Sequence, residues 1–250
     1  RAAVSISAPQ RVSVPYFEAL VQLSHRHHTP PLFAHMLETK TQRVLSQHQA
    51  RFAGRSLVRY TADLGLLDEH TNVIHAVWVD DADLDLIAAA GSTVLHNPVS
   101  NLRLGSGVMP LRAMLDRGIP VGLGVDEAIC NDAVDMWSVV RMAGLIHNIT
   151  DPDSDRWPPG HRGARLSLGG RRPGDGTAGH LGRHRARPAR RSRDAGPAHA
   201  YLHPPRNDVA GQLVYCENGS DVVATMVDGV LVAGAGRLTS RSGGPPGRGT

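Results

Sequence analysis

Short apolar runs alternate with helix-like stretches through the first 150 residues. Stretches with apolar residues on one helical face, between typical helix start and stop residues, are Asp81–Ala90, Pro110–Arg117 and Asp132–Asn148. Short apolar runs predict five strands: Val4–Ser7, Leu32–His35, Asn72–Ala76, Thr93–His96 and Val121–Val125. Because strands that alternate with helices are typical of a parallel sheet, we expect an α/β fold.

The spacing of these strands indicates part of a larger barrel. A closed (β/α)8 barrel needs roughly 250 residues, or about 31 for each unit. Residues 1–150 therefore provide about five of eight units. We expect a partial (β/α)8 TIM-type barrel over residues 1–158, comprising about strands four to eight, with the first strands missing. Residues 159–204 and 205–250 are expected to form two further regions.

The positive charge of the chain is concentrated between residues 160 and 200. The formal net charge is +4, yet residues 160–200 contain ten arginines, nine glycines and two acidic residues. This stretch has few apolar residues and no aromatic residue, so it cannot bury enough surface to offset the entropy of ordering. We expect residues 159–204 to be poorly ordered. An arginine-rich nucleic-acid-binding protein is a less favoured alternative.

Several protein classes are disfavoured by composition. No run of 18 apolar residues is present, so we expect no membrane span. The first residues lack the pattern of a signal peptide. The two cysteines, Cys130 and Cys216, are too few for a disulfide framework and are expected to be free thiols. These features together predict a cytoplasmic protein.

Polar residues with metal-binding or proton-transfer chemistry end four of the predicted strands. They are His35, His75, His96 and Asp126. In parallel barrels the active site lies at the carboxyl ends of the strands. Histidine nitrogen and carboxylate oxygen together suit zinc or a similar divalent metal. Glu38 follows His35 by three residues, where its carboxyl group could transfer a proton without binding the metal.

The segment HNPVSNLRLGSG, residues 96–107, is rich in polar and turn-forming residues. Beyond its first residue we expect a rigid polar loop at the catalytic edge. Asn97, Ser100 and Asn101 in this loop could hold a substrate. An ordinary turn-rich connection between a strand and a helix would have similar residues.

Four stretches, taken in order and spacing, are similar to one known family. They are His35-Met-Leu-Glu38-Thr39, His75-Ala-Val-Trp78, HNPVSNLRLGSG and Gly122-Leu-Gly-Val-Asp126. Residues 31–148 resemble the amidohydrolase superfamily, in the branch of methylthioadenosine/S-adenosylhomocysteine deaminases and triazine hydrolases. Residues 1–30 fit more loosely. Residues 206–236 resemble the returning strands of the family's small β-sandwich, so the resemblance implies a β-sandwich remnant and a flexible tail over 205–250.

The resemblance implies a role for each matching residue. His35 and Asp126 would bind Zn2+ or another divalent metal such as Fe2+. Glu38 would be the acid and base, His75 would orient or polarise the substrate and water, and Asp126 would also accept a proton. The family's remaining metal ligands form an HxH pair on the first strand, which these residues do not supply. The substrate pocket would be formed by His96, Asn97, Ser100, Asn101 and Glu127.

The implied activity is hydrolysis of a C–N bond in a purine-, nucleoside- or triazine-like ring by metal-activated water. Glu127 replaces the glycine that is commoner in the family after Asp126, so the substrate and the leaving group (ammonia, alkylamine or chloride) stay open. The expected partner is a small heterocyclic substrate, and a homo-oligomer is left open. A catalytically inactive remnant is the alternative from another functional class.

The resemblance also leads to a hypothesis about residues 160–203. The family has a closing helix and an apolar strand there, whereas this chain has the arginine-rich segment. A shifted reading frame over residues 193–203 could encode an apolar strand. We therefore expect few buried side chains and little regular structure in this segment, whether it is a frame-shifted stretch or a true insertion.

Overall fold

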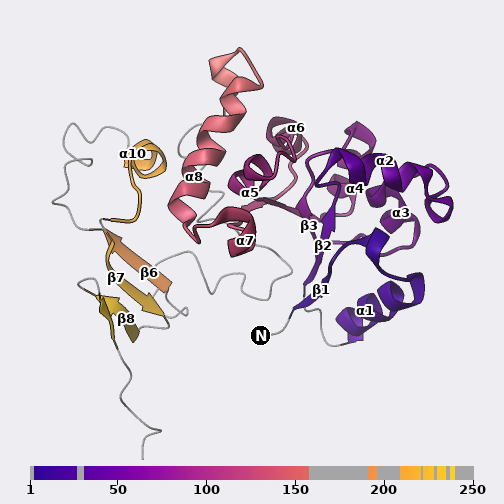
Figure 1. The fold of residues 1–250 in the computed structure, drawn as a ribbon, viewed down its shortest axis with the longest axis horizontal. Helices are drawn as coiled ribbons and strands as arrows, with labels where there is room; N and C mark the ends of the chain where they lie inside the picture. Colours follow the sequence, from indigo (N-terminus) through magenta and orange to yellow (C-terminus); the bar gives the residue numbers. More distant parts are fainter. Residues whose placement is uncertain are drawn as a thin grey trace, which may run out of the picture.

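The computed structural model describes residues 3–26, 31–157, 191–195, 209–220, 222–227, 230–234 and 237–239. The frame hypothesis concerns residues that lie mostly outside these ranges. Figure 1 shows a larger part with strands flanked by helices and, apart from it, a smaller sheet. Among the described residues, no helix is both long enough and apolar enough to cross a bilayer.

Five strands form one parallel sheet, and their order in the sheet is their order in the chain. Each differs from its predicted range by no more than two residues at either end. The prediction of an α/β fold around a parallel sheet is confirmed. The strands are β1 (Val4–Ile6), β2 (Leu32–Met36), β3 (Thr71–His75), β4 (Thr93–His96) and β5 (Val121–Leu123).

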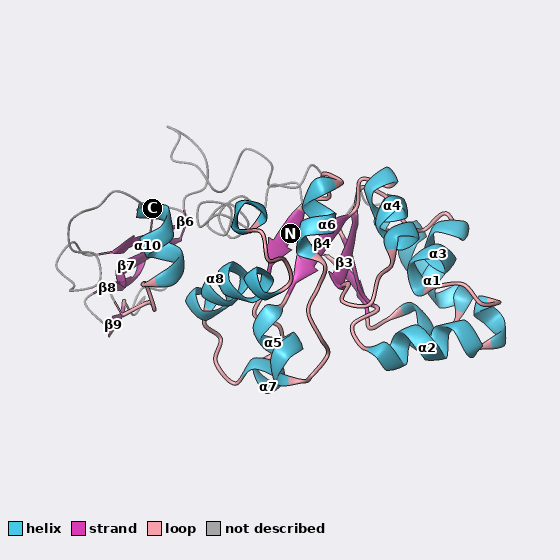
Figure 2. Ribbon diagram, turned by 90° about the horizontal axis from the view of Figure 1, so that it is seen from above, coloured by secondary structure: helices cyan, strands magenta, loops and turns pink. Residues whose placement is uncertain are grey.

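Helices connect successive strands, as Figure 2 shows from above. Short 3-10 helices, labelled η, lie at Pro9–Arg11, Ala50–Phe52, Ile146–Ile149 and Ser154–Arg156. The α-helices are α1 (Val14–Arg26), α2 (Lys40–His48), α3 (Leu57–Asp63), α4 (Asp81–Ala89), α5 (Pro98–Arg103), α6 (Leu111–Asp116), α7 (Ala128–Asn131), α8 (Met136–Leu145) and α10 (Val209–Tyr215).

Two of the three helices predicted from periodicity begin with a side-chain cap. The Asp80 side chain accepts a hydrogen bond from the backbone N–H of Asp83, and the Asp83 side chain accepts one from the backbone N–H of Asp80. Helix α4 therefore begins with a capping box. Asp135 accepts from the backbone of Trp137 and Ser138 at the start of α8. Such a cap contributes about 1 kcal/mol to helix stability. Helix α6 begins after Pro110, a residue favoured at helix starts.

The core lies between the sheet and the helices that cover it. Ala34, Met36, Val73 and Val94 are fully buried on the strands. Phe17 from α1 and Phe52, Leu57, Ile87 and Met114 from the helical layer belong to the same apolar cluster. Burial of each large side chain contributes about 1.5–3 kcal/mol. This packing fixes the strands and therefore the positions of the residues at their ends.

Two segments differ from the sequence-based expectation. Residues 98–103, expected to be loop, form α5, because Pro98 occupies a first-turn position and Asn101 N–H donates to the Asn97 carbonyl. Residues 209–215, expected among returning strands, form α10. Val214 of α10 is fully buried, and a side chain at Gly144 would lie 2.9 Å from it. Close packing on α8 therefore favours a helix there.

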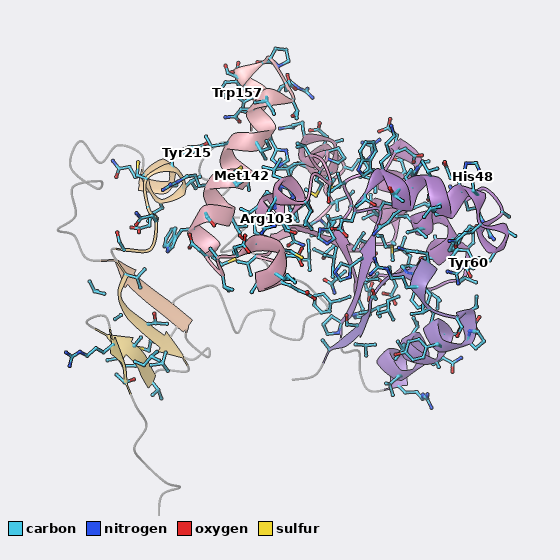
Figure 3. All side chains as sticks on the ribbon, in the orientation of Figure 1. His48, Tyr60, Arg103, Met142, Trp157 and Tyr215 are labelled. Atoms are coloured by element: carbon cyan, nitrogen blue, oxygen red, sulfur yellow. The ribbon has the colours of Figure 1, made fainter. Side chains whose placement is uncertain are left out.

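The smaller sheet is antiparallel, with the order β6 (Arg191–Ala195), β7 (Val222–Val227), β8 (Val230–Gly234) and β9 (Arg237–Leu238). Strand β6 lies in the segment expected to have little regular structure, and residues 159–190 and 196–204 of that segment lie outside the described residues. Backbone groups alone can form a ladder, and β7 supplies the partner. Helices α8 and α10 lie side by side (Figure 1), and Tyr215 Oη, labelled in Figure 3, donates to the Gly144 carbonyl over 3.4 Å.

Candidate functional site

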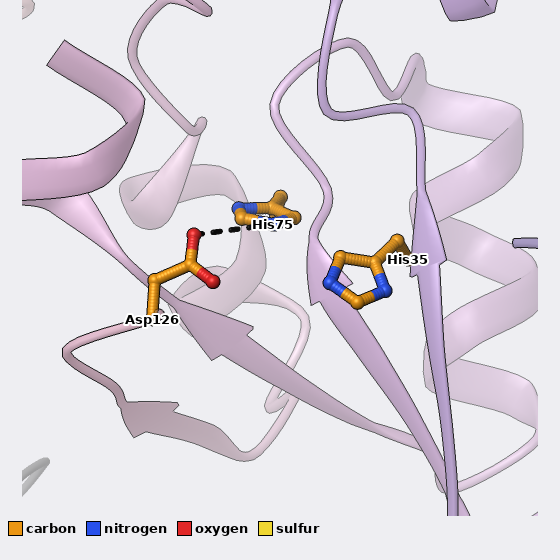
Figure 4. Close-up of side chains that lie close together, drawn as sticks. All are labelled: His35, His75 and Asp126. Carbon is orange, nitrogen blue, oxygen red and sulfur yellow. Dashed lines mark ion pairs between the residues drawn. The ribbon is translucent and has the colours of Figure 1, made fainter. Parts of the chain in front are cut away.

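The carboxyl ends of β2 and β3 and the loop after β5 bring His35, His75 and Asp126 together (Figure 4). One ligand atom from each residue lies within 4.8 Å of the others. The two imidazole rings have centroids 5.3 Å apart. Residues separated by 91 positions in the chain therefore converge, as expected for polar residues at the same edge of a parallel sheet.

The backbone at this edge is strained. Leu37, His75, Ala76 and Asp126 have positive φ angles of 54°, 74°, 50° and 64°, although none is glycine. Such conformations cost of order 1–3 kcal/mol each and persist only where the surroundings hold them. The Ala76 and Trp78 backbone N–H groups donate to the carbonyls of Met36 and Leu37, which fixes the turns after β2 and β3. These backbone conformations occur where the side chains of His35, His75 and Asp126 come together.

The ring of His35 is oriented by the end of β1. Its Nδ1 lies 2.7 Å from the carbonyl oxygen of Ser7, and a carbonyl can only accept a hydrogen bond. The Nδ1 must therefore carry the proton, which leaves the Nε2 lone pair free. A histidine that binds a metal commonly has this arrangement.

The ring of His75 is buried and lies between polar groups on both sides. Its Nδ1 is 2.8 Å from Asn101 Oδ1. Its Nε2 is 3.8 Å from Glu38 Oε2 and 3.8 Å from Asp126 Oδ2. Burial lowers the pKa of His75, although the two carboxylates oppose this effect. The neutral imidazole is thus favoured.

The carboxylate of Asp126 is held by two donors. Ser100 Oγ donates to Oδ2 over 2.6 Å, and the backbone N–H of Glu127 donates to Oδ1 over 2.9 Å. The Asp126 side chain is 11% exposed and that of Glu38 is 17% exposed, so both carboxylates are largely shielded from solvent. Glu38 approaches the cluster from the turn after β2.

The donor set of this cluster fits a divalent metal. Two imidazoles and one carboxylate are ligands that zinc accepts. The Nδ1 of His35 and the Nδ1 of His75 both face an acceptor oxygen, so the Nε2 atoms remain for coordination. His35 and Asp126 were expected to be ligands, and the structure adds that His75 lies within the same candidate group.

The residues expected to line a substrate pocket are placed differently from one another. Asn97, Ser100 and Asn101 are buried, with exposures of 4%, 0% and 1%. The hydrogen bonds of Ser100 and Asn101 are directed at Asp126 and His75. Glu127 is exposed beside the cluster. Direct substrate contact stays a prediction for all four.

His96, also expected in the pocket, contacts a residue that no sequence pattern singles out. Its Nε2 lies 3.0 Å from the Nε2 of His147, and both residues are buried. Burial lowers the pKa of His96 well below its usual value and that of His147 to about 4. Residue 147 is 51 positions away in the chain, and only the fold brings the rings together. The second residue missed, Ser7, ends a predicted strand beside His35.

Comparison with known proteins supports one family. Residues 1–161 match the model of the amidohydrolase family. The chain is 31% identical over 238 residues to a 5-methylthioadenosine/S-adenosylhomocysteine deaminase of Thermococcus kodakarensis, covering 90% of the chain and 51% of that protein. It is 34% identical over 119 residues to a 5'-deoxyadenosine deaminase of Methanopyrus kandleri, covering 48% and 27%. The chain spans about half the length of the first of these relatives, and less of the second.

Solved structures give the same fold. A zinc-bound adenosine deaminase from Xanthomonas campestris superimposes with a TM-score of 0.88 at 24% identity, covering 96% of the chain and 53% of that protein. A zinc complex of atrazine chlorohydrolase from Arthrobacter aurescens has a TM-score of 0.85 at 22% identity, with 95% and 51% covered. Given the match over residues 1–161, this chain belongs to the amidohydrolase family.

Proposed function

We propose that the protein containing this chain is a metal-dependent aminohydrolase that removes an amine from a purine-, nucleoside- or triazine-like ring. The observation that carries the proposal is the convergence of His35, His75 and Asp126, with Glu38 beside them. The names of the relatives, which are adenosine-type deaminases and a triazine-type hydrolase, support this substrate class. These activities are those of the relatives, and they motivate the choice of test compounds.

The metal would be held by His35 and Asp126, with His75 in reach. A bound divalent ion would lower the pKa of a water molecule towards neutrality. Asp126 would accept the proton of the attacking water, since its carboxylate is fixed by Ser100 at the edge of the cluster. Glu38 would donate a proton to the ring nitrogen beside the reacting carbon, as the non-ligand glutamate of zinc deaminases does. His75 would orient the water and substrate.

The fold of the whole protein is part of the proposal. We infer a (β/α)8 barrel in which this chain contributes about strands four to eight, because five consecutive parallel strands are present. We also propose that β7, β8 and β9 belong to a small β-sandwich over residues 205–250, next to the 159–204 segment. The two described cysteines are unpaired, which fits the expected cytoplasmic location.

The test uses the protein that contains this chain, purified with zinc. Ammonia release would be measured with 5-methylthioadenosine, S-adenosylhomocysteine and adenosine, and amine or chloride release with atrazine. In Glu38→Gln we expect full zinc content and a decrease in kcat of about 10²- to 10⁴-fold, because the lost group transfers a proton. Glu69→Gln is the matched control, since the Glu69 side chain is 70% exposed.

Each outcome has a defined meaning. Turnover of any of these compounds that depends on Glu38 supports the proposal and identifies the leaving group. Full activity in Glu38→Gln would refute its assignment. Failure of the protein to retain zinc or to turn over any of the compounds would favour the inactive remnant. The 250-residue chain alone is expected to bind metal weakly and to show little or no activity.

A further inference from the structure

The two ring nitrogens of His75 face different surroundings. Nδ1 faces two amides, with Asn101 Oδ1 at 2.8 Å and Asn97 Nδ2 at 3.4 Å. Nε2 faces the carboxylates of Glu38 and Asp126, each at 3.8 Å. A neutral imidazole has one proton, so the nitrogen that carries it decides whether the side facing the carboxylates donates or accepts hydrogen bonds.

Four neighbours influence the position of this proton. Asn97 Nδ2 can only donate and would favour an unprotonated Nδ1, but its 3.4 Å contact is longer than a normal hydrogen bond. The carboxylates of Glu38 and Asp126 attract it to Nε2 electrostatically, but at 3.8 Å they are beyond hydrogen-bond distance. Asn101 Oδ1, at 2.8 Å, is within that distance of Nδ1 and can only accept. With the proton on Nε2, two buried acceptor atoms would face each other there without a hydrogen bond between them, which is unfavourable. The short contact therefore favours the proton on Nδ1.

The backbone of Asn101 is fixed beside the His75 ring. The residue is 1% exposed and lies in α5. Its backbone N–H donates to the Asn97 carbonyl, and its own carbonyl accepts from Ser106 over 2.7 Å. These bonds place the side chain next to His75, where Oδ1 contacts Nδ1 over 2.8 Å.

We propose that Asn101 is a positioning residue that fixes His75 in the tautomer with Nδ1 protonated and an Nε2 lone pair facing Glu38 and Asp126. The Nε2 then accepts a hydrogen bond from water or binds a cation, and it cannot donate to a substrate before taking up a proton. This differs from a role in which a protonated Nε2 polarises the substrate. Its catalytic meaning rests on the proposed function, whereas the tautomer itself does not.

The tautomer can be measured directly by NMR. The chain would be labelled with 15N-histidine, freed of metal with a chelator and studied at pH 8.5, above the usual histidine pKa of about 6.5. The His75 signals would be identified by their loss in His75→Gln. We expect a protonated-type shift for Nδ1 and an unprotonated-type shift for Nε2. In Asn101→Ala the Nδ1 proton should be lost and Nε2 should become protonated.

Two further variants separate this effect from a general disturbance. Asn101→Asp keeps an oxygen beside Nδ1, so its Nδ1 should stay protonated. Ser100→Ala removes a neighbouring contact that reaches Asp126 only, so the His75 tautomer should not change. An Nε2 proton in the unmodified chain would overturn the proposal even if Asn101→Ala failed to fold. Retention of the Nδ1 proton in a folded Asn101→Ala would also overturn it. An inactive protein would refute the proposed function without altering these nitrogen shifts.

Discussion

Two histidines end neighbouring parallel strands with the same burial but different partners. His75 ends β3 and His96 ends β4, and each residue is 1% exposed. The ring of His75 lies between an amide and two carboxylates. The ring of His96 faces another imidazole, that of His147, over 3.0 Å. Burial lowers the pKa of both His75 and His96.

The partners decide what each ring can do. Carboxylates next to His75 partly offset the cost of a positive charge, so this ring can take part in proton exchange. Within the described part of the chain no carboxylate opposes the effect of burial on the pKa of His96, and His147 would repel a charge there. Two neutral rings can share one hydrogen bond, with one as donor and the other as acceptor. The surroundings of His75 therefore suit proton transfer, whereas those of His96 suit a buried structural contact.

The largest effect on zinc affinity is expected when the carboxylate of Asp126 is removed. Asp126→Ala should weaken zinc binding by more than about 100-fold, because it deletes a candidate ligand, and even loss of a group that only orients a ligand typically costs 10- to 100-fold. Isothermal titration calorimetry with zinc would measure this. Asp132→Ala removes an exposed carboxylate nearby and serves as control. Equal affinities in the two variants would exclude Asp126 as a ligand.

Removing one ring of the His96–His147 pair should lower the free energy of unfolding and leave the metal site intact. His147→Leu leaves the buried Nε2 of His96 without its partner, at a cost of about 2 kcal/mol in the free energy of unfolding. Urea denaturation would measure this, and zinc affinity should match that of the unmodified chain. The double variant His96→Leu/His147→Leu should lose less stability than the sum of the single variants. A large loss of zinc affinity in His147→Leu would contradict the distinction between the two sites.

The strand ends could be predicted because local pattern and chain topology agree there. His35, His75 and Asp126 each follow an apolar run, and parallel strands place their carboxyl ends at one edge. The contact of Ser7 with His35 follows from the same topology, because β1 and β2 are neighbours. His147 lies on a helix whose sequence pattern indicated only an apolar face. Its contact with His96 depends on how that helix packs, which the pattern does not determine.

One error originates in local composition. Polar and turn-forming residues suggested a loop over residues 98–103, but a first-turn proline and one backbone hydrogen bond suffice to begin α5. The arginine-rich composition predicts little regular structure over residues 159–204, and Arg191–Ala195 within that range pair with β7. For residues 98–103 a backbone interaction overrides the preference expected from side chains.

A smaller effect should follow from removing the hydroxyl that orients Asp126. Ser100→Ala keeps every candidate ligand but deletes the 2.6 Å hydrogen bond to Oδ2. Groups that orient a ligand typically change metal affinity by about 10-fold or more. We expect the zinc dissociation constant to increase roughly 10-fold. Ser13→Ala, at an exposed position, is the control. Unchanged affinity in Ser100→Ala would show that the backbone alone orients Asp126.

The smallest effect concerns the pH dependence of stability, which tests the His96–His147 pair independently of the metal site. His147 has a pKa of about 4 in the folded chain because it is buried, against about 6.5 when unfolded. The unfolded state therefore binds more protons below pH 6.5, and the stability that this ring contributes is complete above that pH and is lost as pH falls towards 4. Between pH 6.5 and 5.5 the loss should be about 1 kcal/mol for this ring. Urea denaturation of the metal-free chain at these two pH values would measure it. His147→Leu should decrease the pH dependence by that amount, whereas an unchanged slope would mean that the pKa of His147 is the same in the folded and the unfolded chain.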